Sequence, residues 1–449
     1  SHYQPFAGIY STYMIPRLAD KQKMLLMLAA AIKSVYASVY YRDSKAYMTA
    51  TSNVIDQEKM AVILQEVVGT DHDGHFYPTL SGVLRSINYY PIGDEKPEEG
   101  IASLALGLGK YIVDGGQTLR VSPYHPTQVL QLSDVELALR DTQTRFYALD
   151  MRREGTDFQV DDGFNILNLR VRQAEKDGAL RYISSTYDVD DQMIHDGFYP
   201  GGRKIISFSG LLKNGVFPLP ELMQMSLSYG AQAMRRPVEI EMACNINDDR
   251  TGDFCLLQIR PIVDTKQEIV EDITAIPDAD CLLRSHTALR NGVSRELTDV
   301  VYVKYDDAFS AANNPAVAAD IERINQLFLD DGRNYVLIGP GRWGSSDPWL
   351  GVPVKWPALS AARIIVEVAL AGYHVDPSQG THFFQNLTSL GVGYFTVDTN
   401  HSPEGGFVNK DILDSMPAIS ETAYVRHVRF GRPLKIMIDG KRQEGAVVM

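Results

Sequence analysis

Two apolar runs joined by a polar segment decide the fold: Val238-Glu-Ile-Glu-Met242 and Phe254-Cys-Leu-Leu-Gln-Ile-Arg-Pro261, with residues 245–252 between them. The first run has β-branched Val238 and Ile240 at alternating positions, the second is apolar at residues 254–257 and 259, and the connecting segment is rich in Asn and Asp and ends at Gly252. This pattern predicts an antiparallel hairpin with a long loop.

Four polar side chains of this hairpin are candidates for a shared site. Side chains alternate between the faces of a strand, so Glu239 and Glu241 share one face, and Gln258 and Arg260 share one face of the partner strand. If those faces coincide, carboxylate and amide oxygens that suit Mg²⁺ lie beside a guanidinium that suits phosphate. A solvated hairpin with cross-strand Glu and Arg pairs explains the same pattern, and both interpretations stay open.

The rest of the chain predicts a mixed α and β protein, of the α+β class. Helical spacing and short β-branched runs alternate along its first 265 residues. Helices are expected at residues 20–41, 132–149 and 219–234, and strands at 60–68, 79–88 and 101–106.

A second domain is expected after the hairpin. Residues 263–280 have the composition of a connector, with the boundary near 265–270. This divides the chain into a domain of residues 1–265 and a C-terminal α/β domain of residues 266–449, whose role the sequence does not disclose. In the latter, helices are expected at 316–328 and 358–371, and strands at 335–338, 392–397 and 434–438.

Composition excludes several classes of partner. The 449 residues include 43 Lys and Arg against 56 Asp and Glu, a net charge of −13 that repels nucleic acid. The longest apolar run, residues 24–32, is about half of a membrane span. Three scattered cysteines, Cys244, Cys255 and Cys281, predict reduced thiols in a cytoplasmic protein and no thiolate zinc site.

Several motifs resemble one known family. Val238-Glu-Ile-Glu-Met-Ala243 with Leu257-Gln-Ile-Arg-Pro-Ile262 is similar to the metal and phosphate end of the nucleotide-binding domain of phosphoenolpyruvate synthase and pyruvate phosphate dikinase. Three further segments agree in order: Phe6-Ala-Gly-Ile-Tyr-Ser-Thr-Tyr13, Ser81-Gly-Val83 and Leu106-Gly-Leu-Gly109. The resemblance implies an ATP-grasp fold and the ligands ATP and Mg²⁺.

The resemblance also implies roles for single residues of the hairpin. Glu241 and Gln258 would hold Mg²⁺, Glu239 would support the metal site, and Arg260 would contact the transferred phosphate as the catalytic residue.

Two other segments receive weaker assignments from the resemblance. Gln65, Glu66 and Val68 fall where the family's hinge strand meets adenine, although a buried strand end explains them equally well. Gly107 and Gly109 would let the backbone approach phosphates, a pattern that two turn glycines also produce.

Departures from the family pattern lower the expected affinity for ATP. Arg85, Tyr89 and Lys110 replace an aromatic residue, a proline and a glutamate that the family usually has. The family's lysine and arginine of the phosphate loops would lie before Ser1, so this chain alone is expected to bind ATP weakly and to turn it over negligibly.

The function that the resemblance implies is phosphoryl transfer from Mg-ATP to a carrier histidine on a domain outside this chain, and the C-terminal domain is expected to have no phosphocarrier role. Pyruvate or phosphoenolpyruvate would also be bound by a domain outside this chain. An ATP-grasp carboxylate ligase and a nucleotide-sensing module with a partner-binding C-terminal domain are the alternatives. A homo-oligomer is compatible with each of them.

Other polar clusters are weaker candidates. Residues 71–75, Asp-His-Asp-Gly-His, could bind a metal but are more typical of a polar loop. His382 is the best remaining histidine for phosphoryl or acid-base chemistry, although a buried structural histidine explains it too. All three tryptophans lie within residues 339–357 beside Arg342 and Lys355, either packing a loop or lining an anion site.

Overall fold

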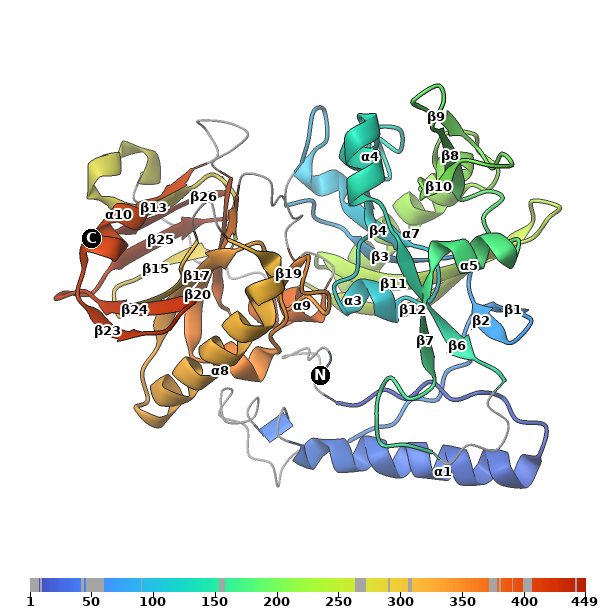
Figure 1. The fold of residues 1–449 in the computed structure, drawn as a ribbon, viewed down its shortest axis with the longest axis horizontal. Coiled ribbons are helices and arrows are strands. Elements are labelled where there is room, and N and C mark those ends of the chain that lie inside the picture. Colours follow the sequence, from blue (N-terminus) through green and yellow to red (C-terminus); the bar gives the residue numbers. More distant parts are fainter. Residues whose placement is uncertain are drawn as a thin grey trace.

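The computed structural model describes residues 8, 10–41, 44–45, 60–89, 91–152, 158–262, 272–289, 291–305, 309–370, 378, 381–389, 391–398, 406–440 and 442–449. Two units lie side by side along the long axis (Figure 1). The N-terminal unit, blue to yellow-green, is on the right, and the C-terminal unit, yellow to red, is on the left. Both contain helices and sheets, so the expected mixed α and β class is confirmed.

The centre of the N-terminal unit is a five-stranded antiparallel sheet of order β12-β11-β3-β4-β5. The hairpin predicted from the sequence forms two of its strands. The strands are β3 Leu80–Arg85, β4 Ile101–Ala105, β5 Leu119–Val121, β11 Val238–Ile246 and β12 Gly252–Pro261. Because β12 is the edge strand, one side of the hairpin is open to other segments of the chain.

Two smaller sheets and several helices of the described residues complete this unit. The sheets contain β1 Thr70–His72, β2 His75–Tyr77, β6 Arg145–Asp150 and β7 Ile166–Arg170, and then β8 Ser184–Asp188, β9 Met193–Asp196 and β10 Arg203–Ile206. The helices are α1 Lys21–Ala37, α3 Lys110–Val113, α4 Val135–Asp141, α5 Val171–Lys176, α6 Ser209–Leu212 and α7 Leu219–Met234. Helix α7 buries Met223 and Leu227 in the same core as Val238 and Ile240 of β11, which fixes the back of the hairpin.

Among the described residues, the C-terminal unit has two large sheets, of seven and of five strands, and a third of two strands. The seven-stranded sheet, of order β14-β21-β20-β17-β16-β24-β23, contains β14 Ala288–Leu289, β16 Asp299–Val303, β17 Tyr335–Pro340, β20 Ala362–Ala369, β21 Gly393–Asp398, β23 Ala418–Glu421 and β24 Val425–Arg429. The five-stranded sheet contains β13 Cys281–Ser285, β15 Asn291–Ser294, β22 Phe407–Val408, β25 Lys435–Asp439 and β26 Glu444–Val448. The remaining elements are α8 Asn314–Asp330, α9 His382–Ser389, α10 Lys410–Ser415 and the short pair β18 Arg342–Trp343 and β19 Gly351–Val352.

The seven-stranded sheet is covered on both faces. Val301, Leu337 and Ile365 belong to the core that α8 and α9 share, whereas neighbouring residues such as Val300 and Val366 belong to the core shared with the five-stranded sheet. This alternation is what a strand period of two produces. The expected domain boundary at 265–270 lies outside the described residues.

Three predicted elements were wrong. Residues 60–68 form no strand, and Ile63 is 85% exposed, because the segment lies beside the edge strand β12 without pairing its backbone to it. The helix at 132–149 is only α4, since β6 begins at Arg145. Residues 358–371 contain β20 in place of a helix, because its β-branched run is buried between two parallel neighbours.

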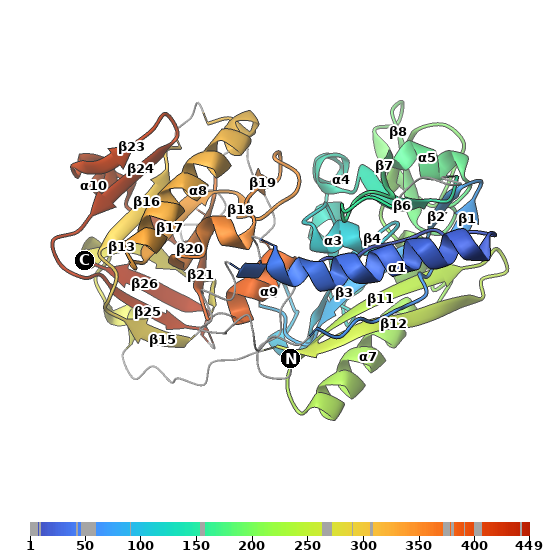
Figure 2. The same ribbon diagram turned by 90° about the horizontal axis from the view of Figure 1, so that it is seen from below.

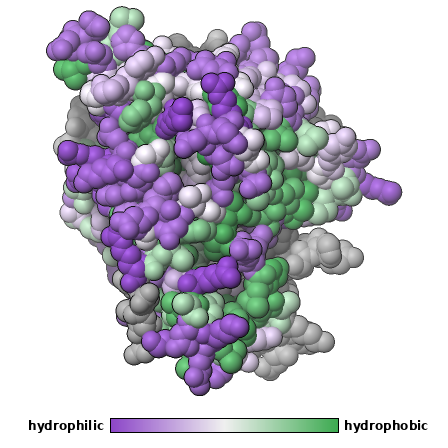
Figure 3. All heavy atoms as spheres, turned by 90° about the vertical axis from the view of Figure 1, so that its right-hand side faces the viewer, coloured by the Kyte–Doolittle hydropathy of each residue, from purple (hydrophilic) through white to green (hydrophobic). Residues whose placement is uncertain are grey.

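Helix α1 lies along the outside of the N-terminal unit (Figure 2). Asp20 caps it by accepting hydrogen bonds from the amides of Gln22 and Lys23, at 2.8 and 3.2 Å. The helical residues 21–40 are long and apolar enough to cross a membrane by length and composition alone. A single helix of this kind is weak evidence for a membrane span. Leu25 and Leu26 are 65% and 68% exposed, and hydrophobic atoms also gather on the end of the molecule shown in Figure 3.

The two units meet through a few named contacts. The amide of Ser346 donates to the carbonyl oxygen of Asp114 at 3.0 Å. The guanidinium of Arg85 in β3 lies 4.5 Å from the ring centroid of Phe384 in α9. Helix α9 faces the N-terminal unit in both ribbon views (Figures 1 and 2), so it is the element of the C-terminal unit that lies toward the hairpin.

Candidate functional site

The hairpin register places the four polar side chains on one face. Glu241 of β11 is directly opposite Gln258 of β12, and Glu239 is directly opposite Arg260. Side chains of directly opposed residues lie on the same face, with Cβ atoms about 4.5–5.5 Å apart. A β-bulge follows Glu241, an irregularity that is frequent beside functional sites because it redirects side chains.

Glu239 is the buried anchor of this group. Its Oε2 accepts hydrogen bonds from Nε and Nη2 of Arg85 at 2.7 and 2.6 Å, and its Oε1 lies 3.5 Å from Nε of Arg260. The side chains of Arg85 and Glu239 are each 4% exposed. With both oxygens facing arginines, Glu239 fits a supporting role and not that of a direct metal ligand.

Arg260 joins Glu239 to Glu241. Its Nη2 donates a hydrogen bond to Oε1 of Glu241, while its buried Nε has no hydrogen-bond partner in the described part of the chain. A buried guanidinium N–H without an acceptor is costly unless a ligand supplies one. The arrangement therefore fits a phosphate oxygen at Arg260.

Glu241 and Gln258 have the right chemistry for Mg²⁺. Burial raises the pKa of Glu241, and the nearby Arg260 opposes this rise. A buried carboxylate is stabilised by a cation, and Mg²⁺ prefers oxygen donors such as this carboxylate and the exposed amide of Gln258. These two residues fit the ion, with Arg260 as the present counter-charge of Glu241.

The segment expected to meet adenine runs beside the edge strand. Nε2 of Gln65 donates to the carbonyl oxygen of Leu257, in the bulge of β12, at 3.3 Å. Gln65 and Glu66 are exposed and Val68 is partly buried. The hinge residues thus lie next to the hairpin, but without the buried strand that the alternative interpretation required.

The two glycines before α3 differ in their structural needs. Gly107 has φ of +86°, and a Cβ added to it would lie 2.6 Å from the carbonyl oxygen of Tyr147. Gly109 has an ordinary φ of −59°, and its Cβ would meet only Ser81, at 3.5 Å. Backbone geometry therefore explains Gly107 without a ligand, whereas nothing in the packing requires Gly109.

Paired alanine substitutions separate these two roles. Gly107→Ala is expected to lower the free energy of unfolding by about 1–3 kcal/mol through backbone strain and crowding. Gly109→Ala should leave thermal stability within experimental error. It should weaken ATP binding, because a bound phosphate would approach the backbone where the added Cβ lies. Thermal melting and calorimetric titration with Mg-ATP check both. Unchanged ATP affinity in Gly109→Ala would remove Gly109 from the site.

His382 and Lys110 also belong to this region, and the hairpin motif did not reveal them. His382 is the first residue of α9 and is partly buried. Burial lowers the pKa of His382 to about 3, and the positive charges of Arg260 and Lys110 add to the effect. Lys110 lies at the start of α3, where its Nζ is 3.0 Å from the carboxylate of Asp114. A histidine of the C-terminal unit therefore lies within the electrostatic field of Arg260, the candidate phosphate-binding residue.

The tryptophan-rich loop is mainly a packing element. Trp343 and Trp356 are buried in the core beneath α8, and Trp349 is 66% exposed. Arg342 is also buried, and among the described residues its guanidinium makes no hydrogen bond or ion pair. Lys355 is exposed. Packing thus accounts for two tryptophans, and Arg342 keeps the anion-binding interpretation open.

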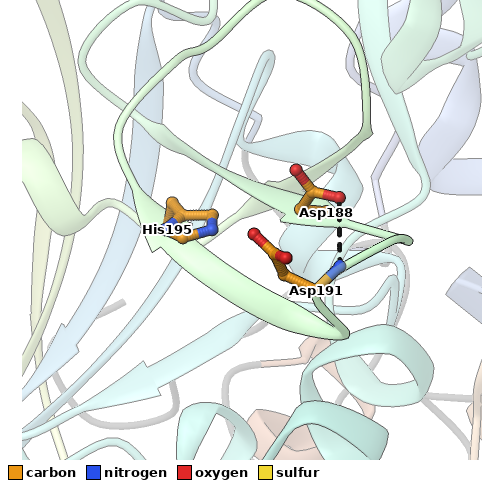
Figure 4. A group of neighbouring side chains, drawn as sticks. All are labelled: Asp188, Asp191 and His195. Carbon is orange, nitrogen blue, oxygen red and sulfur yellow. Dashed lines mark hydrogen bonds between the residues drawn. The ribbon is translucent and has the colours of Figure 1, made fainter.

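Two His and Asp clusters lie away from the hairpin site. Residues 71–75 form the turn of the β1–β2 hairpin. On the β8–β9 hairpin, ligand atoms of Asp188, Asp191 and His195 lie within 4.8 Å of one another (Figure 4). Asp188 already accepts the amide of Asp190 at 2.8 Å, and both Asp191 and His195 are exposed. We assign no ion to either cluster.

Comparison with known families identifies the nucleotide-binding part. Residues 1–279 match the family model described as pyruvate phosphate dikinase, AMP/ATP-binding domain. The chain belongs to this family. Its domain is of the ATP-grasp type, as the motifs implied, and ATP is its ligand. A search of curated proteins found no match.

Proposed function

We propose that this pyruvate phosphate dikinase family chain binds Mg-ATP at the β11–β12 hairpin and transfers a phosphoryl group from it to a carrier histidine. The observation that supports this best is the register of the hairpin. It places Arg260, whose buried Nε makes no hydrogen bond among the described residues and lies 3.5 Å from Oε1 of Glu239, beside the oxygen donors of Glu241 and Gln258. Pyruvate or phosphoenolpyruvate would then be the final partner, bound outside this chain.

Each residue of the site has a separate task in this proposal. Bound Mg²⁺ would neutralise phosphate charge, and Glu241 and Gln258 would hold it. Arg260 would grip phosphate oxygens in a fork and neutralise the charge that develops during transfer. Glu239 keeps the guanidinium of Arg260 in place through their ion pair, and Arg85 in turn holds Glu239 by hydrogen bonds. Phosphoryl transfer depends mainly on such positioning and electrostatics.

Glu241→Gln tests the proposal without removing bulk. Losing a charged ligand contact costs about 1.5–3 kcal/mol, so the affinity for Mg-ATP should fall by roughly 10- to 100-fold. Calorimetric titration with Mg-ATP, and with ATP in EDTA, measures the effect. Asp253→Asn, at an exposed position near the other end of β12, is the matched control and should bind as the unaltered protein does.

The difference in stability between the unaltered protein and Glu241→Gln has a defined pH dependence. The pKa of Glu241 is raised in the folded state, so folding favours its protonated form. Its contribution to stability is therefore largest below the ordinary glutamate pKa and decreases as pH rises through the raised value. At neutral pH the variant should melt no lower than the unaltered protein. Unchanged Mg-ATP affinity together with a lower melting temperature would show that Glu241 serves the fold and not the metal.

A further inference from the structure

Helix α9 is connected to the hairpin site through a continuous set of contacts. Phe384 packs under Arg85, at 4.5 Å, and Arg85 holds Glu239 by two hydrogen bonds. Glu239 faces Arg260 across the hairpin at 3.5 Å. Helix α9 begins at His382, and this imidazole is close enough to Arg260 and Lys110 for both cations to act on its charge.

A buried polar network fixes the start of α9. Glu367 accepts hydrogen bonds from the hydroxyl of Ser378 and from the amide of Trp343, the latter at 2.9 Å. The hydroxyl of Thr381 donates to the carbonyl oxygen of Ser378 at 2.7 Å and accepts the amide of Phe384 at 3.1 Å. Because this network is anchored in the seven-stranded sheet, His382 is held on a rigid support.

The two ring nitrogens of His382 differ in their surroundings: Nδ1 is covered by the main chain, and Nε2 is on the other side of the ring. A Cβ added to Gly8 would lie 2.6 Å from Nδ1, so the main chain at Gly8 closely covers that side of the ring. The charged groups that act on this imidazole are the cations Arg260 and Lys110, and both disfavour its charged form. Nε2 is therefore the nitrogen available to a ligand.

We propose that His382 is the phosphoryl acceptor of the nucleotide site, so that the carrier histidine lies within this chain. The inference rests on the proposed function. The lone pair of Nε2 attacks a phosphorus of the ATP triphosphate and forms an N–P bond. The P–O bond to the leaving nucleotide breaks, and its electron pair stays on the oxygen of that nucleotide. The proton on Nδ1 passes to solvent, which leaves a neutral phosphorylated ring.

The surroundings of His382 favour both halves of this step. The lowered pKa keeps the imidazole neutral at physiological pH, and only the neutral ring has a free lone pair for attack. After transfer, the new phosphate carries negative charge, which Arg260 and Lys110 neutralise. The position at the N-terminus of an eight-residue helix adds stabilisation from the helix dipole.

Labelling with radioactive ATP tests the assignment. The full chain is incubated with Mg²⁺ and ATP labelled at the β or the γ position, and acid-labile, base-stable label on protein is counted. We expect label on His382, located by mass spectrometry, and at least a 100-fold loss in both His382→Ala and His382→Asn. His195→Ala, which removes an exposed histidine of the β8–β9 hairpin, should label as the unaltered chain does.

The outcomes separate this inference from the proposed function. Calorimetry first establishes that each variant binds Mg-ATP and melts as the unaltered chain does. Binding with label on another residue, or with label unaffected in both His382 variants, would overturn the assignment of His382 and leave the proposed function standing. Absence of Mg-ATP binding in the unaltered chain would overturn both. The labelling rate should also be independent of pH between about 5 and 8, whereas an ordinary histidine pKa of about 6.5 would make it rise.

Discussion

Replacing Glu239 by alanine is expected to lower the free energy of unfolding by about 3–5 kcal/mol. Glu239 is 3% exposed and faces two arginines, of which Arg85 is equally buried. Its removal leaves the Arg85 guanidinium without a counter-charge away from water, and this desolvation is the main cost. Urea unfolding followed by circular dichroism measures the change.

A paired substitution controls for the loss of packing volume. Replacing both members of a buried ion pair by apolar residues of similar size is often neutral, because no charge is left uncompensated. Arg85→Met with Glu239→Leu should therefore recover most of the stability lost in Glu239→Ala. If Glu239→Ala alone unfolds within 1 kcal/mol of the unaltered protein, the buried pair is not the anchor of the site.

The same pair shows what the sequence could and could not predict. The alternation of Glu239, Glu241, Gln258 and Arg260 predicts a shared face, because strand periodicity is a local property. The partner of Glu239 is not predictable in this way. Arg85 comes from β3, and the register that pairs it with Glu239 is set by the packing of the whole sheet.

Errors in the predicted elements have a related cause. Residues 60–68 and 358–371 each contain runs that are compatible with more than one structure, and sheet order decides between them. Strand β20 is extended because β17 and β21 flank it, and residues 60–68 lack such neighbours among the described strands. Local propensity is outweighed by tertiary context in both cases.

The approach of His382 to Arg260 shows the largest gap between sequence and structure. The sequence singles out His382 by its residue type and polar neighbours, but nothing local relates it to the hairpin. Its position depends on α9 packing against Arg85, a contact between two separate units. Only the folded structure brings the candidate acceptor and the candidate phosphate-binding residue together.

Arg260→Ala is expected to reduce phosphoryl transfer by about 10³-fold or more, the range found when an arginine that stabilises transition-state charge is removed. The fold should be affected much less, because Arg85 still holds Glu239 by two hydrogen bonds and Glu241 is only partly buried. The measurement is the rate of label transfer from ATP, with melting temperature recorded beside it.

Arg260→Lys separates charge from geometry at the same position. Lysine keeps the positive charge but cannot form the two-pronged contact that a guanidinium makes with phosphate oxygens. The variant should therefore retain most of the Mg-ATP affinity and lose much of the transfer rate. Equal rates in Arg260→Ala and in the unaltered chain would mean that Arg260 only closes the hairpin by pairing with its carboxylates, and that the phosphate is bound elsewhere.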